Sequence, residues 1–329
     1  MIRLNKKFIM NTAESRLKNF PVSWFSTVMG MCGLSIAWNR AEHFFNSGFC
    51  LSSILLGITT LLFLVLLIIY ARKLIKYRAE VIEELKHPVK HAFFPTISIS
   101  LLLLSAAYLQ RDPDLSLILW IVGASLQLIL TLYVLSSWMH HDRYEITHLN
   151  PAWFIPVVGN MIVPIAGVHH APIEISWLFF SMGLFFWPIL TSIIFYRLVF
   201  HTALPERLLP TLFIFIAPPA VGTIAWVTLI GHVDAFTHFM FSVGLVFTLL
   251  LFSQINHFRR IKFFLSWWAY SFPLAAMTIA SLLMTKQTGN VFYLYLGYLL
   301  ITILNALIIV LIWKTVFAIY RREICVAGH

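Results

Sequence analysis

Charged side chains are scarce in this chain of 329 residues. Only 11% of the residues are Asp, Glu, Lys or Arg, and 60% are hydrophobic. Soluble domains carry about 25% charged residues, so this composition excludes a soluble protein. Cysteine is also rare, with Cys32, Cys50 and Cys325 as the only three. Their spacing fits neither a metal site nor a disulfide framework, and we interpret them as apolar packing residues.

Long uncharged runs fill the chain instead. A helix that crosses a bilayer needs about 20 largely apolar residues. Ten runs without Asp, Glu, Lys or Arg meet or approach that length, and no soluble domain fits between them. We therefore predict an all-α integral membrane protein with a membrane domain at residues 20–312 and cytoplasmic segments at residues 1–19 and 313–329. The ten predicted transmembrane helices are residues 20–38, 49–71, 92–109, 115–137, 152–168, 175–196, 208–230, 235–253, 263–284 and 291–312.

The positive charges indicate which way the chain faces. With the N-terminus inside, Arg40, Arg111 and Lys286 are outside, and the remaining 20 of the 23 Lys and Arg residues are inside. Cytoplasmic loops carry such an excess of Lys and Arg, so both termini are predicted to be cytoplasmic. The net charge of +10 is thus mainly a topology signal. Because the charges are dispersed over separate loops, no nucleic-acid surface is expected.

Proline is distributed unevenly between the predicted helices. The even-numbered helices contain only Pro188, whereas the odd-numbered helices contain eight prolines. A proline inside a helix bends it and frees a carbonyl, which must be satisfied by protein or by a water-filled cavity. We therefore expect five quasi-symmetric hairpins, each pairing a bent inner helix with a straighter outer one. The prolines expected to bend the inner helices are Pro95, Pro156, Pro164, Pro218, Pro219 and Pro273.

Five inner helices leave room for a narrow pore. Neighbouring helix axes pack 8–10 Å apart, so a pentagon with sides of about 9.5 Å has its corners about 8 Å from the centre. Subtracting a helix radius of about 5 Å leaves a hole of roughly 3 Å radius. A partly dehydrated small ion fits such a hole, and one large side chain would fill it.

The predicted helices contain no charged side chain. Intramembrane charges mark proton relays and cation sites, so their absence argues against a carrier based on membrane carboxylates and against an acidic cation pore. The basic residues Arg259, Arg260 and Lys262 are expected to form an inner mouth that favours anions. No helix carries two histidines, and no nucleophile motif is present. We therefore predict no cofactor, no metal site and no enzyme activity.

Two segments resemble a known family. WFSTVMGMCGLSIAW begins at Trp24 and RRIKFFLSWWAYSFPLAAMTIAS begins at Arg259. Both are similar to the tellurite-resistance/dicarboxylate transporter family of bacteria, which is itself similar to the plant guard-cell slow anion channels. The resemblance covers essentially the whole chain. It implies a homotrimer in the bacterial inner membrane, with one pore in each protomer.

The same resemblance implies that Phe263 plugs the pore, because it lies four residues before the first Trp of the WWAY segment. The expected function is a gated channel for small monovalent anions, linked to tellurite resistance. A secondary carrier or exporter of oxyanions or organic acids, such as tellurite or dicarboxylates, is the alternative. A membrane enzyme or cytochrome has little support.

Overall fold

The computed structural model describes residues 16–45, 50–140 and 144–325, and every regular element within these ranges is a helix. Nine segments there are long and apolar enough to cross a membrane. Helix α2 is not among them, because its second half carries Asn39, Arg40 and Glu42. The predicted all-helical membrane fold is therefore confirmed. The count of ten spans stays a prediction.

Burial separates the helices into an inner and an outer set. In four of the nine segments, 78% to 94% of an 18-residue stretch is buried, and in the other five this share is 28% to 33%. The exposed set presents isoleucine, leucine and aromatic side chains outward, as expected of a lipid-facing surface. Its helices are α3 (Leu51–Lys76), α6 (Pro113–His140), α9 (Ile173–Phe200), α11 (Ala235–Ser253) and α14 (Val291–Tyr320).

The inner segments are composite, since each combines 3-10 turns with α-helix. They are η1 (Val22–Trp24) with α2 (Phe25–Phe45); η2 (Lys90–Phe93) with α5 (Thr96–Tyr108); η4 (Pro151–Trp153), α7 (Phe154–Val158), η5 (Gly159–Ile162) and α8 (Val163–His170); η6 (Glu206–Ile216) with α10 (Ala217–Ile230); and η7 (Leu265–Tyr270) with α13 (Ser271–Thr288).

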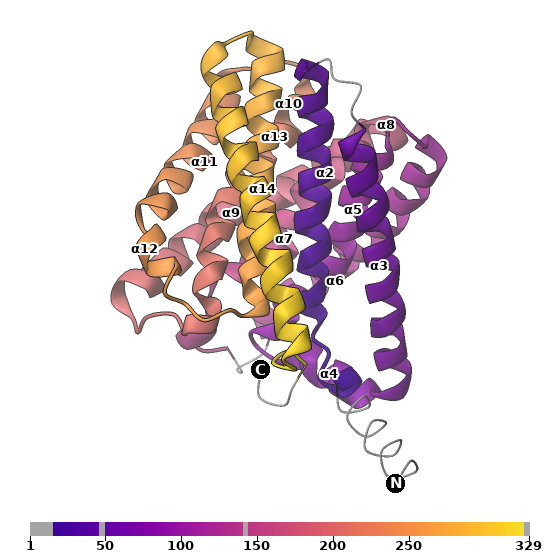
Figure 1. Cartoon of the computed structure of the whole chain (residues 1–329), viewed down its shortest axis with the longest axis vertical. Helices are drawn as coiled ribbons and strands as arrows, with labels where there is room; N and C mark the ends of the chain where they lie inside the picture. The colour runs from indigo at the N-terminus through magenta and orange to yellow at the C-terminus, as the bar shows by residue number, and fades with distance from the viewer. Residues whose placement is uncertain (1–15, 46–49, 141–143, 326–329) are drawn as a thin grey trace.

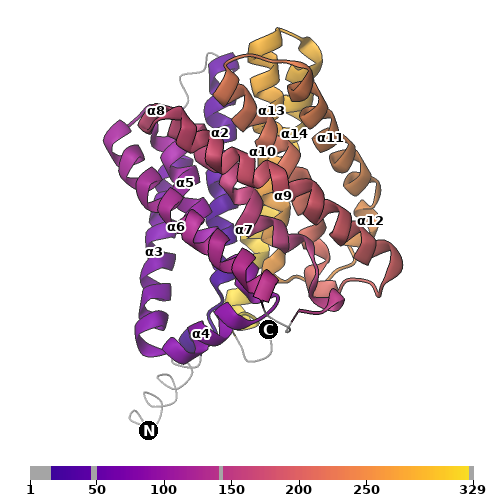
Figure 2. The same ribbon diagram turned by 180° about the vertical axis from the view of Figure 1, so that it is seen from behind.

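These inner segments form a closed ring. Contacts join α2 to α5, α5 to α8, α8 to α10, α10 to α13, and α13 back to α2. Each inner segment also packs against the outer helix that follows it in the chain. The first inner helix and the last outer helix meet in this arrangement, so that α14 lies beside α2 (Figure 1), while α6 and α9 cover the opposite side (Figure 2).

The predicted proline bends are mostly helix starts. Pro95 is the N-cap of α5, and Pro164, Pro218 and Pro273 lie in the first turns of α8, α10 and α13. Proline is well tolerated there, because the first helical N–H groups have no intrahelical partner. The inner helices therefore change from 3-10 to α-helical geometry close to their prolines. At these positions the expected bend within one continuous α-helix is replaced by the start of an α-helix after a 3-10 turn.

Pro156 likewise lies in the first turn of a helix, the short helix α7. Its carbonyl accepts hydrogen bonds from Gln127 Nε2 at 2.9 Å, Thr131 Oγ1 at 2.6 Å and Asn160 Nδ2 at 3.2 Å. Two of these donors come from the outer helix α6, and all three side chains are fully buried. Protein side chains thus satisfy the backbone where the helix is interrupted, as the membrane requires.

The connection between the second and third predicted spans, at residues 72–90, is largely helical. Helix α3 continues to Lys76, and α4 (Arg78–Lys86) follows almost at once. The uncharged run ends at Ala71, but the backbone stays helical because Lys and Arg are good helix formers outside lipid. A run without charges marks the lipid-embedded part of a helix and not the end of the helix.

Small residues bring α2 and α13 into close contact. A Cβ atom added to Gly33 would lie 2.7 Å from the Cβ of Ala275, and one added to Gly30 would collide with the side chain of Ser271. Such small-residue contacts let two membrane helices approach closely. They fix the position of α13 in the ring.

Gly33→Ala should therefore lower the thermal stability of the protein, by about 1–3 kcal/mol of overpacking. Unfolding of the purified protein in detergent would measure this effect. Gly57→Ala is the matched control, because Gly57 lies on α3 with no atom within 4 Å of an added Cβ, and it should be neutral. Equal stability of the two variants would contradict the close packing of α2 on α13.

Candidate functional site: a ring of helices with a chamber at each end

A chamber opens at the end of the ring where α4 and the end of α14 lie (Figure 1). Its volume is about 570 Å³, and all five inner segments contribute to its wall. We call it the Phe263 chamber, because the predicted gate residue is part of its lining. It is mainly apolar, with polar and charged side chains at its rim.

The rim of the Phe263 chamber carries Lys90, Arg207 and Lys262, together with His87. Burial, with Lys90 and Arg207 nearby, lowers the pKa of His87, so its imidazole is neutral at pH 7. The fixed positive charge therefore comes from the two lysines and the arginine. Two acidic residues, Glu84 and Glu323, also line the chamber.

Only one of the three predicted inner-mouth residues lines this chamber. Lys262 does, and its backbone N–H donates to Glu206 Oε1 at 3.0 Å. Arg259 and Arg260 are exposed and are absent from the lining of both chambers. The predicted mouth is thus basic, but Lys90 and Arg207 from other parts of the chain belong to it instead. Sequence spacing could not reveal these two, because they come from different hairpins.

Phe263 lies in a non-helical stretch before η7, where the predicted ninth span was expected to begin. Its half-buried ring contacts Trp267 with a centroid distance of 5.6 Å, and the Trp267 indole N–H donates to the carbonyl of Lys262 at 3.0 Å. Phe263 is therefore at the wall of the chamber, near its basic rim. Its gate role stays a prediction.

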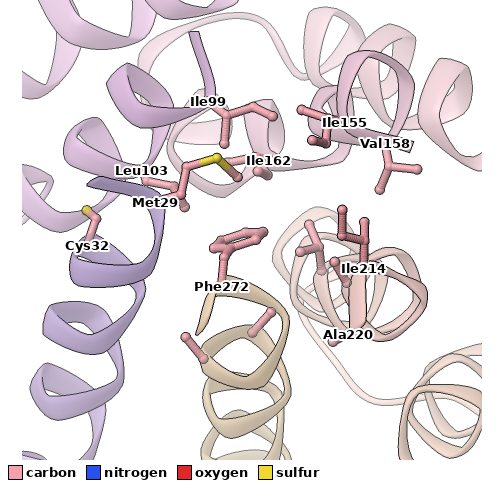
Figure 3. Packing of buried hydrophobic residues seen from close by; sticks show 14 of the residues in the cluster. Met29, Cys32, Ile99, Leu103, Ile155, Val158, Ile162, Ile214, Ala220 and Phe272 are labelled. Carbon is pink, nitrogen blue, oxygen red and sulfur yellow. The ribbon is translucent and has the colours of Figure 1, made fainter. Parts of the chain in front are cut away.

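A different phenylalanine lies at the centre of the ring. Phe272 belongs to α13 and directly precedes Pro273, and its side chain is 9% exposed to the chamber that it lines. Figure 3 shows its ring pointing into the space between the other inner segments. The apolar side chains around it in this view include Met29 of α2, Ile99 and Leu103 of α5, Ile155 and Val158 of α7, Ile162 of η5, and Ile214 and Ala220 of η6 and α10.

A second chamber, of about 450 Å³, lies at the opposite end of the inner segments. We call it the Arg40 chamber. On α5 the lining of the Phe263 chamber ends at Ile99 and that of the Arg40 chamber begins at Ala106. At 1.5 Å per residue, the closed zone between them is about 10 Å long along α5, and it is shorter on the third inner segment, where Ile162 and Ile165 line the two chambers. An apolar layer of this length is a strong barrier to any ion that must shed its water.

Neither chamber offers an obvious site for a metal or for covalent chemistry. Among the described residues, no three His, Cys, Asp or Glu side chains come close enough to hold a metal ion. All three cysteines are free thiols, with Cys32 buried, Cys50 exposed and Cys325 half-buried. What the arrangement can do is to pass or retain a small solute along the axis of the ring.

A closed ring of buried helices inside a sleeve of lipid-facing helices, with a chamber at each end, defines a helical membrane channel or transporter. The chain belongs to the voltage-dependent anion channel family, whose family model, named SLAC1, matches residues 19–316. The resemblance stated from the sequence is thereby confirmed. This family consists of channels and transporters and not of enzymes.

Named relatives agree with this membership. The uncharacterized transporter MJ0762 of Methanocaldococcus jannaschii is 28% identical over 94% of this chain and 98% of its own length. The S-type anion channel SLAH2 of Arabidopsis thaliana is 29% identical over 84% of this chain and 54% of its own length. The tellurite resistance protein TehA homolog of Haemophilus influenzae is 26% identical over 78% and 79% of the two chains.

Proposed function

We propose that this protein is a gated channel for small monovalent anions. The observation that carries the proposal is the position of Phe272 at the centre of the helix ring, where the Phe263 chamber meets the apolar zone that separates it from the Arg40 chamber. Both chambers have basic residues in their walls. Basic walls concentrate anions at both ends of the path. The uncharged zone lacks a tight binding site, so that ions which enter can leave again.

Phe272 is the proposed plug of this channel. Its ring has the size to close a hole of roughly 3 Å radius, which a ring of five helices leaves at its centre. Phe263 was predicted for this role from the family resemblance. Its position beside the basic rim makes it a weaker candidate for the plug than Phe272. The two assignments are separated by the experiment that opens the Discussion.

The orientation, assembly and location follow the sequence-based predictions. We place the Phe263 chamber on the cytoplasmic side of a bacterial inner membrane, because the basic loops lie at that end. A homotrimer in the lipid bilayer, with one path in each protomer, is the proposed assembly. A link to tellurite resistance is proposed from the name of one relative.

The reversal potential in a planar bilayer tests the proposed function. With a tenfold gradient of potassium chloride, an ideal anion-selective path gives a potential near the chloride equilibrium value of about 59 mV, with the sign set by chloride. We expect a value close to this, both for the wild-type protein and for a variant with an enlarged path. A reversal potential of the opposite sign, set by potassium, would contradict an anion channel.

A secondary carrier is the second candidate, because some relatives bear the name transporter. A carrier would give saturable flux coupled to a gradient, without single-channel steps. With ten predicted spans and a cytoplasmic N-terminus, all five predicted hairpins enter the membrane from the same side. This parallel order counts against a carrier, since many carriers are built from inverted repeats. Stepwise currents in the bilayer recording would exclude it.

A further inference from the structure

The Arg40 chamber has an unusual charge. Its lining contains Arg40, Arg111 and Lys286, together with His43 and His169, and it contains no Asp or Glu. The sequence has only three Lys or Arg residues on the predicted outer side, and all three lie in this chamber. The positive charge of the predicted outer side is therefore concentrated in one cavity at the end of the ring.

Three of the acidic residues at this end are engaged elsewhere, and the other two, Asp114 and Glu174, lie in the first turns of α6 and α9 outside the lining of the chamber. Asp112 accepts from the backbone N–H of Leu115 at 3.0 Å, and Asp234 accepts from that of Thr237 at 2.8 Å. Glu42 accepts from both the backbone N–H and the hydroxyl of Ser52, at 2.9 and 2.6 Å. All three therefore stabilise the starts of outer helices, where negative charge is favourable.

Compensation of helix dipoles is the simplest alternative role for the cations, since several inner helices end near this chamber. Arg111 fits that role, because its Nη1 donates to the carbonyl of Ala107 at 3.1 Å. Its Nη2 donates to Ser52 Oγ at 2.7 Å, to Asn39 Oδ1 at 3.2 Å and to Ser53 Oγ at 3.3 Å. The hydrogen bonds of Arg111 are thus largely used by the protein.

Arg40 and Lys286 differ from Arg111 in this respect. Within residues 16–45, 50–140 and 144–325, the structure gives neither of them a hydrogen bond or an ion pair. Arg40 is only partly exposed and lies within α2, and Lys286 projects from the last turn of α13. A guanidinium that is turned into a chamber without a protein acceptor is suited to an anion, because its planar N–H groups bind anionic oxygens or halides.

We propose that the Arg40 chamber is a binding site for a small inorganic monoanion, such as chloride or nitrate, held by Arg40 and Lys286. About 450 Å³ accommodates such an anion with most of its hydration water. The role of the site rests on the proposed function, because it collects anions at the outer end of the conduction path. Binding itself does not require conduction, and so the two can be tested separately.

Anomalous scattering from bromide tests the binding. In crystals of the wild-type protein soaked in sodium bromide, we expect a bromide peak inside the chamber, in contact with Arg40. The peak should be lost in the double variant Arg40→Gln, Lys286→Gln and retained in Arg259→Gln, which removes a positive charge outside both chambers. A wild-type chamber without bromide, or a peak that persists in the double variant, would overturn the proposal.

The second measurement compares conductance at two salt concentrations. The parent protein for this comparison is a variant with an enlarged path, to which the substitutions are added. At about 20 mM chloride the double variant should conduct roughly threefold less than its parent, because a local positive potential raises anion concentration at the entrance. At about 1 M the difference should vanish, since the Debye length falls to about 3 Å.

Two single variants show whether charge is responsible. Lys286→Gln alone should give part of the loss of conductance, and Arg40→Lys, which keeps the positive charge, should preserve conductance. A loss of conductance that is equal at both salt concentrations would reject electrostatic collection.

These outcomes distinguish the site from the channel. A bromide peak in a protein that carries no anion current would retain the site and reject the proposed function. Anion currents without a peak and without a low-salt effect would retain the function and reject the site.

Discussion

Truncating Phe272 to alanine should raise the anion current about tenfold or more above that of the wild-type protein. The closed zone is apolar and about 10 Å long along α5, so an ion that crosses it loses its water without replacement. Removing the ring lets water fill the centre of the helix ring. Each 1.4 kcal/mol removed from the free-energy barrier raises the rate of ion crossing tenfold. Even a modest hydration of the zone lowers the barrier by more than this amount. Planar-bilayer recordings in symmetric chloride would measure the change.

The alternative role for Phe272 is ordinary core packing. Loss of a core phenylalanine costs about 3–5 kcal/mol of stability and creates no ion path. Phe180→Ala is the matched control for this role, because Phe180 is 1% exposed and packs against Trp177 and Trp226 away from both chambers. We expect Phe180→Ala to destabilise the protein without current, and Phe272→Ala to conduct. Thermal unfolding in detergent is measured alongside the currents.

Phe263→Ala separates the two proposed plugs. It removes the same number of atoms from the same chamber, but from the wall beside Trp267. We expect its current to stay close to that of the wild-type protein. A large current from Phe263→Ala with a silent, correctly folded Phe272→Ala would restore the gate that the family resemblance predicted.

The division into inner and outer helices was predictable because two signals agreed. The four most buried segments all carry interior prolines, whereas among the five exposed helices only α9 has one, Pro188. Both follow from the need of lipid-embedded backbone to satisfy its polar groups. The helix boundaries were less predictable, since apolar runs report the thickness of the membrane. They do not show where 3-10 geometry changes to α-helix or where a helix continues into water.

The centre of the path was harder to predict than its walls. Phe263 lies beside Lys262, at the polar end of its apolar run, whereas Phe272 lies near the middle of the same run. A plug in the middle of the membrane should come from the middle of a span, next to the proline that marks the inner helix. This geometric signal was present in the sequence and favours Phe272.

A buried ion pair between α3 and α4 belongs to no sequence motif and was not predicted. Lys73 and Glu84 form a buried ion pair with an Nζ to Oε2 distance of 2.7 Å, and their side chains are 4% and 7% exposed. Lys73 Nζ also donates to the carbonyl of Phe20 at 2.8 Å. Glu84 accepts from the backbone N–H of Val22 at 2.7 Å and from the Tyr70 hydroxyl at 3.2 Å. The connection at residues 72–90 thus supplies a buried ion pair that joins α3, α4 and the start of the first inner segment.

Glu84→Gln should destabilise the protein by about 3–5 kcal/mol, because it leaves the Lys73 ammonium buried without its counter-charge. The same substitution at Glu80 is the matched control on the same helix. Glu80 pairs with Lys18 at 3.0 Å on the surface, where solvent and salt screen the pair, so Glu80→Gln should change stability little. Thermal unfolding of both variants in detergent would give the comparison.

A double-mutant cycle shows whether the effect belongs to the pair. Lys73→Met should also be strongly destabilising, since it leaves the Glu84 carboxylate with only neutral donors. The double variant Lys73→Met, Glu84→Gln should be much more stable than the sum of the single losses predicts, because it removes both buried charges at once. Additive losses would mean that each side chain acts through its own contacts to Phe20 and Val22. A coupled result instead makes the ion pair the element that holds the first inner segment at the rim of the Phe263 chamber, which Glu84 itself lines.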